Sequence, residues 1–231
     1  MDFVSAIKAL EGGLYIVEPS HWKDKYESRF YSATYNRVDT TSYYPAKVYA
    51  CCFSQKRTNE AAWKVYVADK KGLAERCVQF TLNRVELRKQ LDSYAARNNM
   101  RVFEGNILYR LENEINGLHK RNNPHYDELF SPLTEESYLS LLLLKRPAFS
   151  YEEEVRYLFI DANDTIKKDG GDDRVIQLSW SDIVSEVKID SGCCEEEMKI
   201  LEHKLQLAGI NINPTKFNLD KEKNEKSLII E

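Results

Sequence analysis

The stretch from Lys145 to Ile160 (KRPAFSYEEEVRYLFI) constrains the fold most, because it joins a strand-like apolar run to an unusual density of charge. A β-strand places alternate side chains on opposite faces. This alternation predicts that Glu152, Glu154 and Arg156 share one face with the apolar residues that follow. Two carboxylates and a guanidinium at the end of a buried strand could position a ligand, or could neutralise one another at a sheet edge.

Signals for helices and strands alternate along the rest of the chain. Lys47 to Ser54 (KVYACCFS) is typical of a buried strand, and further strands are expected at 14–17, 77–82, 101–109, 175–178, 183–189 and 212–219. Expected helices cover residues 3–11, 20–30, 59–71, 83–98, 134–145 and 194–208. This order predicts an α+β fold with a mixed, mostly antiparallel sheet flanked by helices.

The same pattern predicts the domain organisation. Residues 1–219 are expected to form a single domain, in which 111–133 is a polar insertion, and 220–231 a charged mobile tail. Two helices are expected to turn Val85 and Leu207 toward the core.

Composition limits the classes of partner. A formal net charge of −4 argues against a protein whose whole surface binds nucleic acid, although it does not exclude a local basic patch. The longest apolar run, Leu141 to Leu144, is too short to cross a bilayer. The four His lack metal-ligand spacing, so no metal is predicted.

The cysteines point to a reducing compartment. No C-x-x-C spacing and no secretory leader are recognised, which favours a cytoplasmic protein with reduced thiols. Cys51 and Cys52 lie inside an apolar strand, where a thiol usually behaves as an inert small hydrophobe.

Several residues outside the central stretch are candidates for binding. Trp63 and Tyr66 stand about one helical turn apart, so they could face one pocket or pack their helix onto the sheet. Asp24 and Glu27 would join the site only if the fold brings them to the central strand. The tyrosine-rich region from Tyr31 to Tyr49 is a candidate surface for a protein partner.

Three segments, taken in order, resemble a bacterial family catalogued only as a domain of unknown function, number twenty-nine seventy-one. They are SHWKDKYES, ACCFS followed by AAWKVYVADKKG, and KRPAFSYEEEVR, similar to the family's aromatic-x-D-x-aromatic-E segment, its C-F-S and W-x-x-Y helix, and its K…Y-E-x-E-x-R strand. Members usually begin with a strand that carries a tyrosine and basic residues, and nothing similar precedes Gly13 here. The family itself implies no established reaction.

A distant similarity to ADP-ribosyltransferases suggests the first function, an enzyme that uses NAD, such as a toxin or an anti-phage effector. In that case Glu152, Glu154 and Arg156 would be catalytic, and Ser54 would end the neighbouring small-residue strand. Trp63, Tyr66, Asp24 and Glu27 would complete the ligand site. The chemistry requires a carboxylate that holds a ribose hydroxyl while positive charge develops on the sugar.

Two other functions stay open. One is a non-enzymatic sensor or partner-binding protein in bacterial defence, which the tyrosine-rich region and the acidic balance favour. The other is a nuclease, in which Asp24, Glu27, Glu152 and Glu154 would surround a divalent ion beside Lys145.

Overall fold

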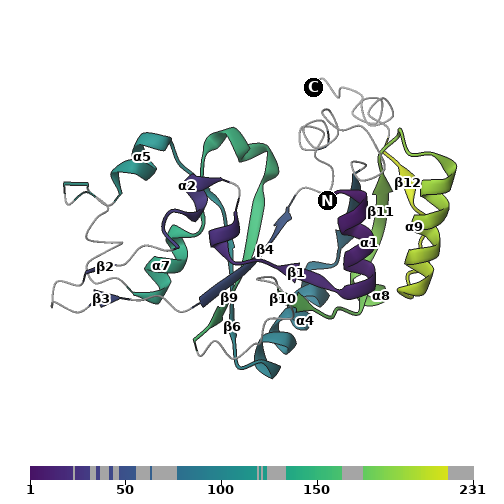
Figure 1. Ribbon diagram of the computed structural model, residues 1–231, viewed down its shortest axis with the longest axis horizontal. Helices are drawn as coiled ribbons and strands as arrows, with labels where there is room; N and C mark the ends of the chain where they lie inside the picture. Colours follow the sequence, from purple (N-terminus) through teal and green to yellow (C-terminus); the bar gives the residue numbers. More distant parts are fainter. Residues whose placement is uncertain are drawn as a thin grey trace, which may run out of the picture. The chain divides into compact units, whose positions relative to one another are not determined.

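The computed structural model describes residues 1–22, 24–31, 35–36, 42–43, 47–55, 63, 77–118, 120, 122–123, 134–162 and 174–217. The chain separates into two compact units. Unit 1 comprises Met1–Leu14, Arg57–Gln90 and Gln177–Glu231, and unit 2 comprises Tyr15–Lys56 and Leu91–Ile176. Helices occur together with mostly antiparallel strands, which confirms the α+β class (Figure 1). The single domain and its insertion stay predictions, and the predicted tail lies outside the described residues.

Unit 2 is built on a three-stranded antiparallel sheet. Strand β9 (Glu154–Asp161) lies between β4 (Lys47–Ser54) and β6 (Arg101–Asn106). Every residue of β9 is buried, because the strand has a neighbour on each side and protein on both faces. The alternative that the charged residues lie at a sheet edge is therefore wrong.

The central strand begins later than its sequence pattern predicts. Residues Pro147–Glu152 form a 3₁₀ helix, η3, and Glu153 adopts the left-handed conformation at φ 41° and ψ 55° before β9 starts. Proline fixes φ near −65° and lacks an N–H, so it suits the first turn of a helix. Glu152 is thus outside the strand, and a shared strand face cannot explain how it lies relative to Glu154.

The segment before η3 is also shorter in its helix than predicted. Helix α7 (Glu135–Leu141) begins at Thr134, whose hydroxyl accepts a hydrogen bond from the Ser137 N–H at 3.1 Å. After a turn, β8 (Leu144–Lys145) pairs parallel with β7 (Leu108–Tyr109). The predicted helix to Lys145 therefore ends one turn early, and this places Lys145 on a strand.

One face of the β4-β9-β6 sheet carries the core of unit 2. The apolar end of β9 contributes Leu158 and Ile160, which are almost wholly buried. The other members come from β4, α7 and neighbouring segments: Phe30, Val48, Ala50, Ile107, Ile115, Leu118, Tyr138, Leu139 and Leu141–Leu144. Ile115 belongs to helix α5 (Glu112–Gly117), so the polar segment after 111 supplies part of this core. The opposite face carries Phe159, whose ring meets that of Tyr94 edge-on.

The chain entering unit 2 forms two short helices where a continuous one was predicted. A 3₁₀ turn, η1 (Pro19–His21), is followed by α2 (Lys25–Ser28). Asp24 caps α2, because its Oδ1 accepts a hydrogen bond from the Tyr26 N–H at 2.9 Å. Asp24 rather than Ser20 therefore starts the helix that carries Glu27.

Two further small strand pairs, besides the β7–β8 pair, complete the described parts of unit 2. Strand β10 (Arg174–Ile176) pairs with β1 (Leu14–Ile16) and not with β9, the central strand that precedes it in the chain. Strands β2 (Tyr35–Asn36) and β3 (Ser42–Tyr43) pair within the tyrosine-rich region. The rest of 32–46 lies outside the described residues.

Unit 1 is built on the sheet β12-β11-β5. Strand β11 (Val184–Ile189) pairs antiparallel with β5 (Val78–Leu82) and parallel with β12 (Thr215–Lys216). Helices α1 (Phe3–Gly12) and α9 (Glu195–Leu207) pack against each other. The short helix α8 (Trp180–Ile183) is joined to α1 by the Trp180 indole N–H, which donates to the Ala9 carbonyl at 3.0 Å.

Two predicted helix faces need correction. Helix α4 (Arg84–Arg97) begins after Asn83, whose side chain accepts the backbone N–H groups of Val85 and Glu86. Val85 is 63% exposed, whereas Leu87 and Leu91 are buried. Leu207, at the end of α9, is 68% exposed, so both predicted inward residues face solvent. Both lie at helix ends, where a periodic pattern fixes the face least well.

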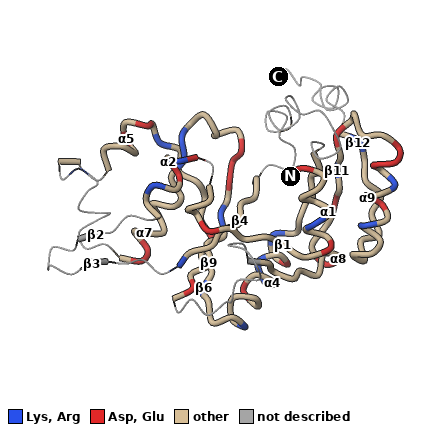
Figure 2. Tube along the Cα trace, viewed as in Figure 1, with Lys and Arg blue, Asp and Glu red and all other residues tan. Residues whose placement is uncertain are grey.

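Charge is interspersed along the described elements. Figure 2 shows acidic and basic residues distributed along both units, as expected for a chain with a small net charge. Across the described part of the chain, no helix combines the length and the apolar character that a membrane span requires.

Candidate functional site

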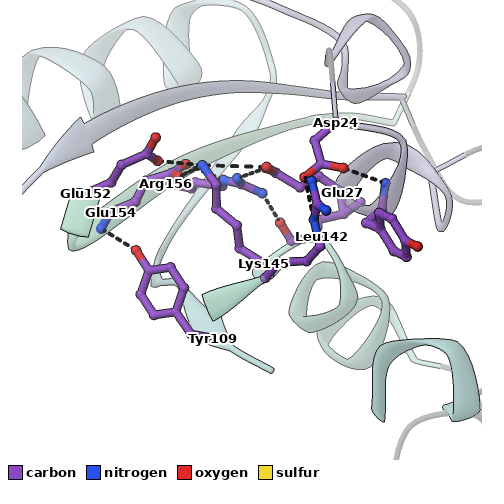
Figure 3. A network of polar contacts seen from close by, with 10 residues as sticks. Asp24, Glu27, Tyr109, Leu142, Lys145, Glu152, Glu154 and Arg156 are labelled. Carbon is purple, nitrogen blue, oxygen red and sulfur yellow. Dashed lines mark hydrogen bonds and ion pairs between the residues drawn. The ribbon is translucent and has the colours of Figure 1, made fainter. Parts of the chain in front are cut away.

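Three segments of unit 2 bring five charged side chains into one buried network, which we call the ion cluster (Figure 3). Its members come from α2, from β8 and from the junction of η3 with β9: Glu27, Lys145, Glu152, Glu154 and Arg156. All of them are buried except Glu152, which is partly exposed.

Lys145 links the three carboxylates. Its Nζ lies 2.5 Å from Glu152 Oε2, 2.7 Å from Glu154 Oε2 and 3.5 Å from Glu27 Oε1. The Phe149 ring, 4.9 Å from Nζ to its centroid, adds a cation–π contact. An ammonium group has three N–H donors, which matches three carboxylate partners.

Arg156 is the most deeply buried charge of the cluster, at 1% exposed. Its Nε donates to Glu154 Oε1 at 2.5 Å, its Nη1 donates to the Leu142 carbonyl at 2.7 Å, and its Nη2 pairs with Glu27. The guanidinium also stacks over the Trp22 ring, 4.2 Å from the centroid. A guanidinium held by this many partners cannot turn toward a ligand, so Arg156 is a structural anchor of the cluster.

The ion cluster contains three carboxylates and two cations, hence a formal charge of −1 when every member is ionised. Burial alone would raise the pKa of Glu154, but the positive charge of Arg156, and then that of Lys145, lowers it to about 2. For Glu27 burial outweighs the same two cations, so its pKa is raised. Glu154 therefore stays ionised at neutral pH, and Glu27 is the carboxylate that gains a proton more readily.

The cations are held in their charged form. Burial alone would lower the pKa of Lys145 and of Arg156. For Lys145 the charge of Glu154, followed by the Glu152 hydrogen bond, raises the pKa above its ordinary range, and for Arg156 the electrostatic influence of Cys52, and then that of Glu154, does the same. Neither side chain is thus available as a neutral base.

A second ion pair flanks the ion cluster. Asp24 Oδ2 accepts from Arg146 Nε at 3.1 Å and from Nη2 at 2.9 Å, while Arg146 Nη1 donates to Glu112 at 2.9 Å. The Arg146 guanidinium also lies over the Tyr26 ring. Asp24 is therefore adjacent to the ion cluster through α2 and β8 without contacting its carboxylates.

Two tyrosines border the cluster. The Glu154 N–H donates to Tyr109 Oη at 3.1 Å. Burial, and then the charge of Glu152, raises the pKa of Tyr151. Both tyrosines are half-buried. The sequence gives no signal for Tyr109, because β7 and β9 meet only in the folded chain. Tyr151 lies in the central stretch, where the sequence predicts a strand and the structure has η3.

The other predicted residues have different outcomes. Ser54, at the end of β4, is paired in register with Glu154, so the structure does bring these two strand ends together. Trp63 belongs to unit 1, where its ring meets Phe217 edge-on at 4.5 Å between centroids. Trp63 therefore packs against an aromatic ring of unit 1. Tyr66 lies outside the described residues.

Cys51 and Cys52 lie on strand β4, where the sequence predicts unreactive thiols. Burial raises the pKa of the Cys51 thiol. Cys52 keeps an exposed surface, yet desolvation of its thiol and the charge of Glu154 raise the pKa of that thiol as well. Neither cysteine is an activated nucleophile in this setting.

No group of three or more His, Cys, Asp or Glu among the described residues has an arrangement that could hold a metal ion. Lys145 and Arg156 occupy the carboxylates that the nuclease hypothesis assigned to a metal. The structure therefore adds no support to that hypothesis. Comparisons with family models, curated proteins and solved structures found no match to this chain, and the family resemblance stays a prediction.

Proposed function

We propose that the chain is a cytoplasmic enzyme of ADP-ribosyltransferase-like type that uses NAD. One observation carries this proposal: Lys145 holds Glu152 and Glu154 side by side, at 2.5 and 2.7 Å, where β9 begins opposite Ser54. Paired carboxylates at the start of a strand are the residue type that this chemistry requires, because positive charge develops on the ribose.

The two carboxylates would have different roles. Glu154 shares its oxygens between Arg156 and Lys145 and is 5% exposed, so it is committed to holding the site together. The Glu152 side chain is 15% exposed and lies at the rim of the ion cluster. Glu152 is therefore the carboxylate that would contact the ribose hydroxyl, and Glu154 would be a positioning residue.

The backbone between these residues also supports a site. Glu153 is in the left-handed region, which a residue with a side chain adopts at an energetic cost. Such conformations concentrate at active sites. The left-handed Glu153 lies between Glu152, at the rim of the ion cluster, and the buried Glu154.

NAD binding and nicotinamide release by the purified chain test the proposal. Wild-type protein should bind NAD saturably and release nicotinamide, and Glu152→Gln should lower the turnover rate by about 100-fold or more. Glu135→Gln is the matched control, since Glu135 is a partly exposed glutamate of unit 2 that pairs with Arg101 and is not a member of the ion cluster. Growth of bacteria after induction of each variant gives a second readout for a toxin or an anti-phage effector.

Absence of NAD binding by the folded wild-type protein would reject the proposal. So would equal turnover by wild type, Glu152→Gln and Glu135→Gln. Either result would favour the second candidate, a non-enzymatic partner-binding protein of bacterial defence.

One observation favours that second candidate: the carboxylates of the ion cluster are satisfied by protein cations, which suits a structural role. The partner surface would then lie in the Tyr31–Tyr49 region. Tyr49 itself is fully buried and cannot contribute. A pulldown with wild-type chain, compared with a chain whose β2–β3 tyrosines Tyr35 and Tyr43 are changed to Ala, tests this function.

A further inference from the structure

Lys145 contacts the carboxylate that would touch the ribose, although Lys145 itself lies away from solvent. We propose that Lys145 is a positioning residue that fixes Glu152 in the orientation needed for catalysis. This inference rests on the proposed function and assigns a role to a residue that the sequence pattern linked only to a metal-dependent reaction.

Glu152 needs such a residue because the sheet does not place it. It is the last residue of η3, and the left-handed Glu153 separates it from the hydrogen-bonded ladder of β9. A side chain at such a junction has several rotamers within reach. The Lys145 Nζ, 2.5 Å from Glu152 Oε2, selects one of them.

Lys145 can serve as a fixed point because its own position is over-determined. It lies on β8, and its side chain is 9% exposed. Glu154 holds Nζ at 2.7 Å, Glu27 approaches from α2 at 3.5 Å, and the Phe149 ring covers it. A charge held in this way is preorganised, so little reorganisation is needed when a ligand arrives.

The charge balance makes Lys145 hard to replace. Without it, three carboxylates would share one cation, Arg156, which already donates to Glu154, Glu27 and the Leu142 carbonyl. Glu152 would lose the cation that holds its carboxylate beside Glu154. Arginine would restore the charge but presents a planar fork instead of three donors from one nitrogen.

The experiment compares the kcat and KM of nicotinamide release from NAD for Lys145→Met, Lys145→Arg and Arg146→Met. Arg146→Met is the matched control, because Arg146 is the adjacent residue and pairs with Asp24 and Glu112 instead of Glu152. Circular dichroism and urea unfolding confirm that each variant is folded.

Lys145→Met should lower kcat about tenfold, with a much smaller change in KM. Lys145→Arg should also lower kcat, because charge is kept and geometry is lost. Arg146→Met should leave kcat near its wild-type value.

Two results separate the possible failures. If wild-type protein releases nicotinamide and Lys145→Met keeps the wild-type kcat, the positioning role is overturned while the proposed function stands. If wild-type protein neither binds NAD nor releases nicotinamide, both are overturned. Should Lys145→Met fail to fold, a Lys145→Arg variant with wild-type kcat would overturn the role by itself.

Discussion

Replacing Glu154 by Gln should cost far more stability than replacing Glu27, although both carboxylates pair with the same two cations. The pKa of Glu154 falls from 4.5 to about 2 in the folded chain. That difference corresponds to about 3 kcal/mol of stabilisation at neutral pH, and burial of Glu154 leaves little solvent to screen it.

The pKa of Glu27 moves the other way, because burial outweighs its cationic neighbours. Its ionised form is therefore a net cost to the folded state at neutral pH. Glu27→Gln keeps an oxygen acceptor for Arg156 and brings the formal charge of the ion cluster to zero. We expect it to lower the free energy of unfolding by no more than about 1 kcal/mol.

The sign of each pH dependence follows from these directions. The stabilisation from Glu154 is fully present above pH 4.5 and is lost as pH falls from 4.5 toward 2. Glu27 has the opposite effect, since its raised pKa makes the folded state more stable once it is protonated. The deficit of Glu154→Gln relative to wild type should consequently shrink below pH 4.5.

Urea unfolding followed by tryptophan fluorescence measures this deficit. Of the three Trp, only Trp22 belongs to unit 2, and its ring lies against Arg156. A background carrying Trp63→Phe and Trp180→Phe makes Trp22 the reporter of the ion cluster. Equal midpoints and slopes for Glu154→Gln and Glu27→Gln at pH 7 would refute the reasoning, as would a Glu154→Gln deficit that is as large at pH 3 as at pH 7.

Three further outcomes are expected in the same unfolding assay. Leu91→Ala should lower the free energy of unfolding by about 2–5 kcal/mol, because Leu91 is fully buried on α4. Val85→Ala should change it by less than about 0.5 kcal/mol, because Val85 is 63% exposed. Similar costs for the two variants would reject the observed buried face of α4. Asn83→Ala should cost about 1 kcal/mol, since two backbone N–H groups lose their acceptor, and an unchanged midpoint would contradict that cap. Glu153→Gly should stabilise by up to about 1 kcal/mol by relieving the left-handed conformation, while a loss would mean that the Glu153 side chain stabilises the fold by more than this strain.

The sequence predicts a buried element correctly where its apolar pattern is long and uninterrupted. Strand β4 runs from Lys47 to Ser54 as predicted, because KVYACCFS has nearly continuous apolar or small residues. Helix α4 was readable for the same reason, since Asn83 and an apolar period mark its start and its buried face. The sequence pattern predicts that Val85, in the first turn, faces the core, but Val85 is exposed. The helical period does not show whether another segment covers this turn.

The start of β9 could not be read in the same way. The run of three glutamates before Val155 is compatible with a strand or with a turn, and the left-handed Glu153 has no sequence signal comparable to a glycine. The pairing of β10 with β1 was equally hidden, because it joins segments about 160 residues apart.

Membership of the site was partly predictable. Glu152, Glu154 and Arg156 stood out because charge rarely occurs at the end of an apolar strand, and the structure brings them together. That Glu27 joins them depends on the placement of α2 against β8, which only tertiary packing decides. Arg156 is predicted as a catalytic residue, yet its burial makes it a structural anchor.

Nicotinamide release from NAD by wild-type protein and by Glu152→Gln tests the central claim most directly. The account predicts saturable NAD binding and measurable release by wild-type protein, with turnover at least about 100-fold slower in Glu152→Gln and unchanged in Glu135→Gln. A folded wild-type protein that neither binds NAD nor releases nicotinamide would contradict the account and leave the ion cluster as a structural element of unit 2.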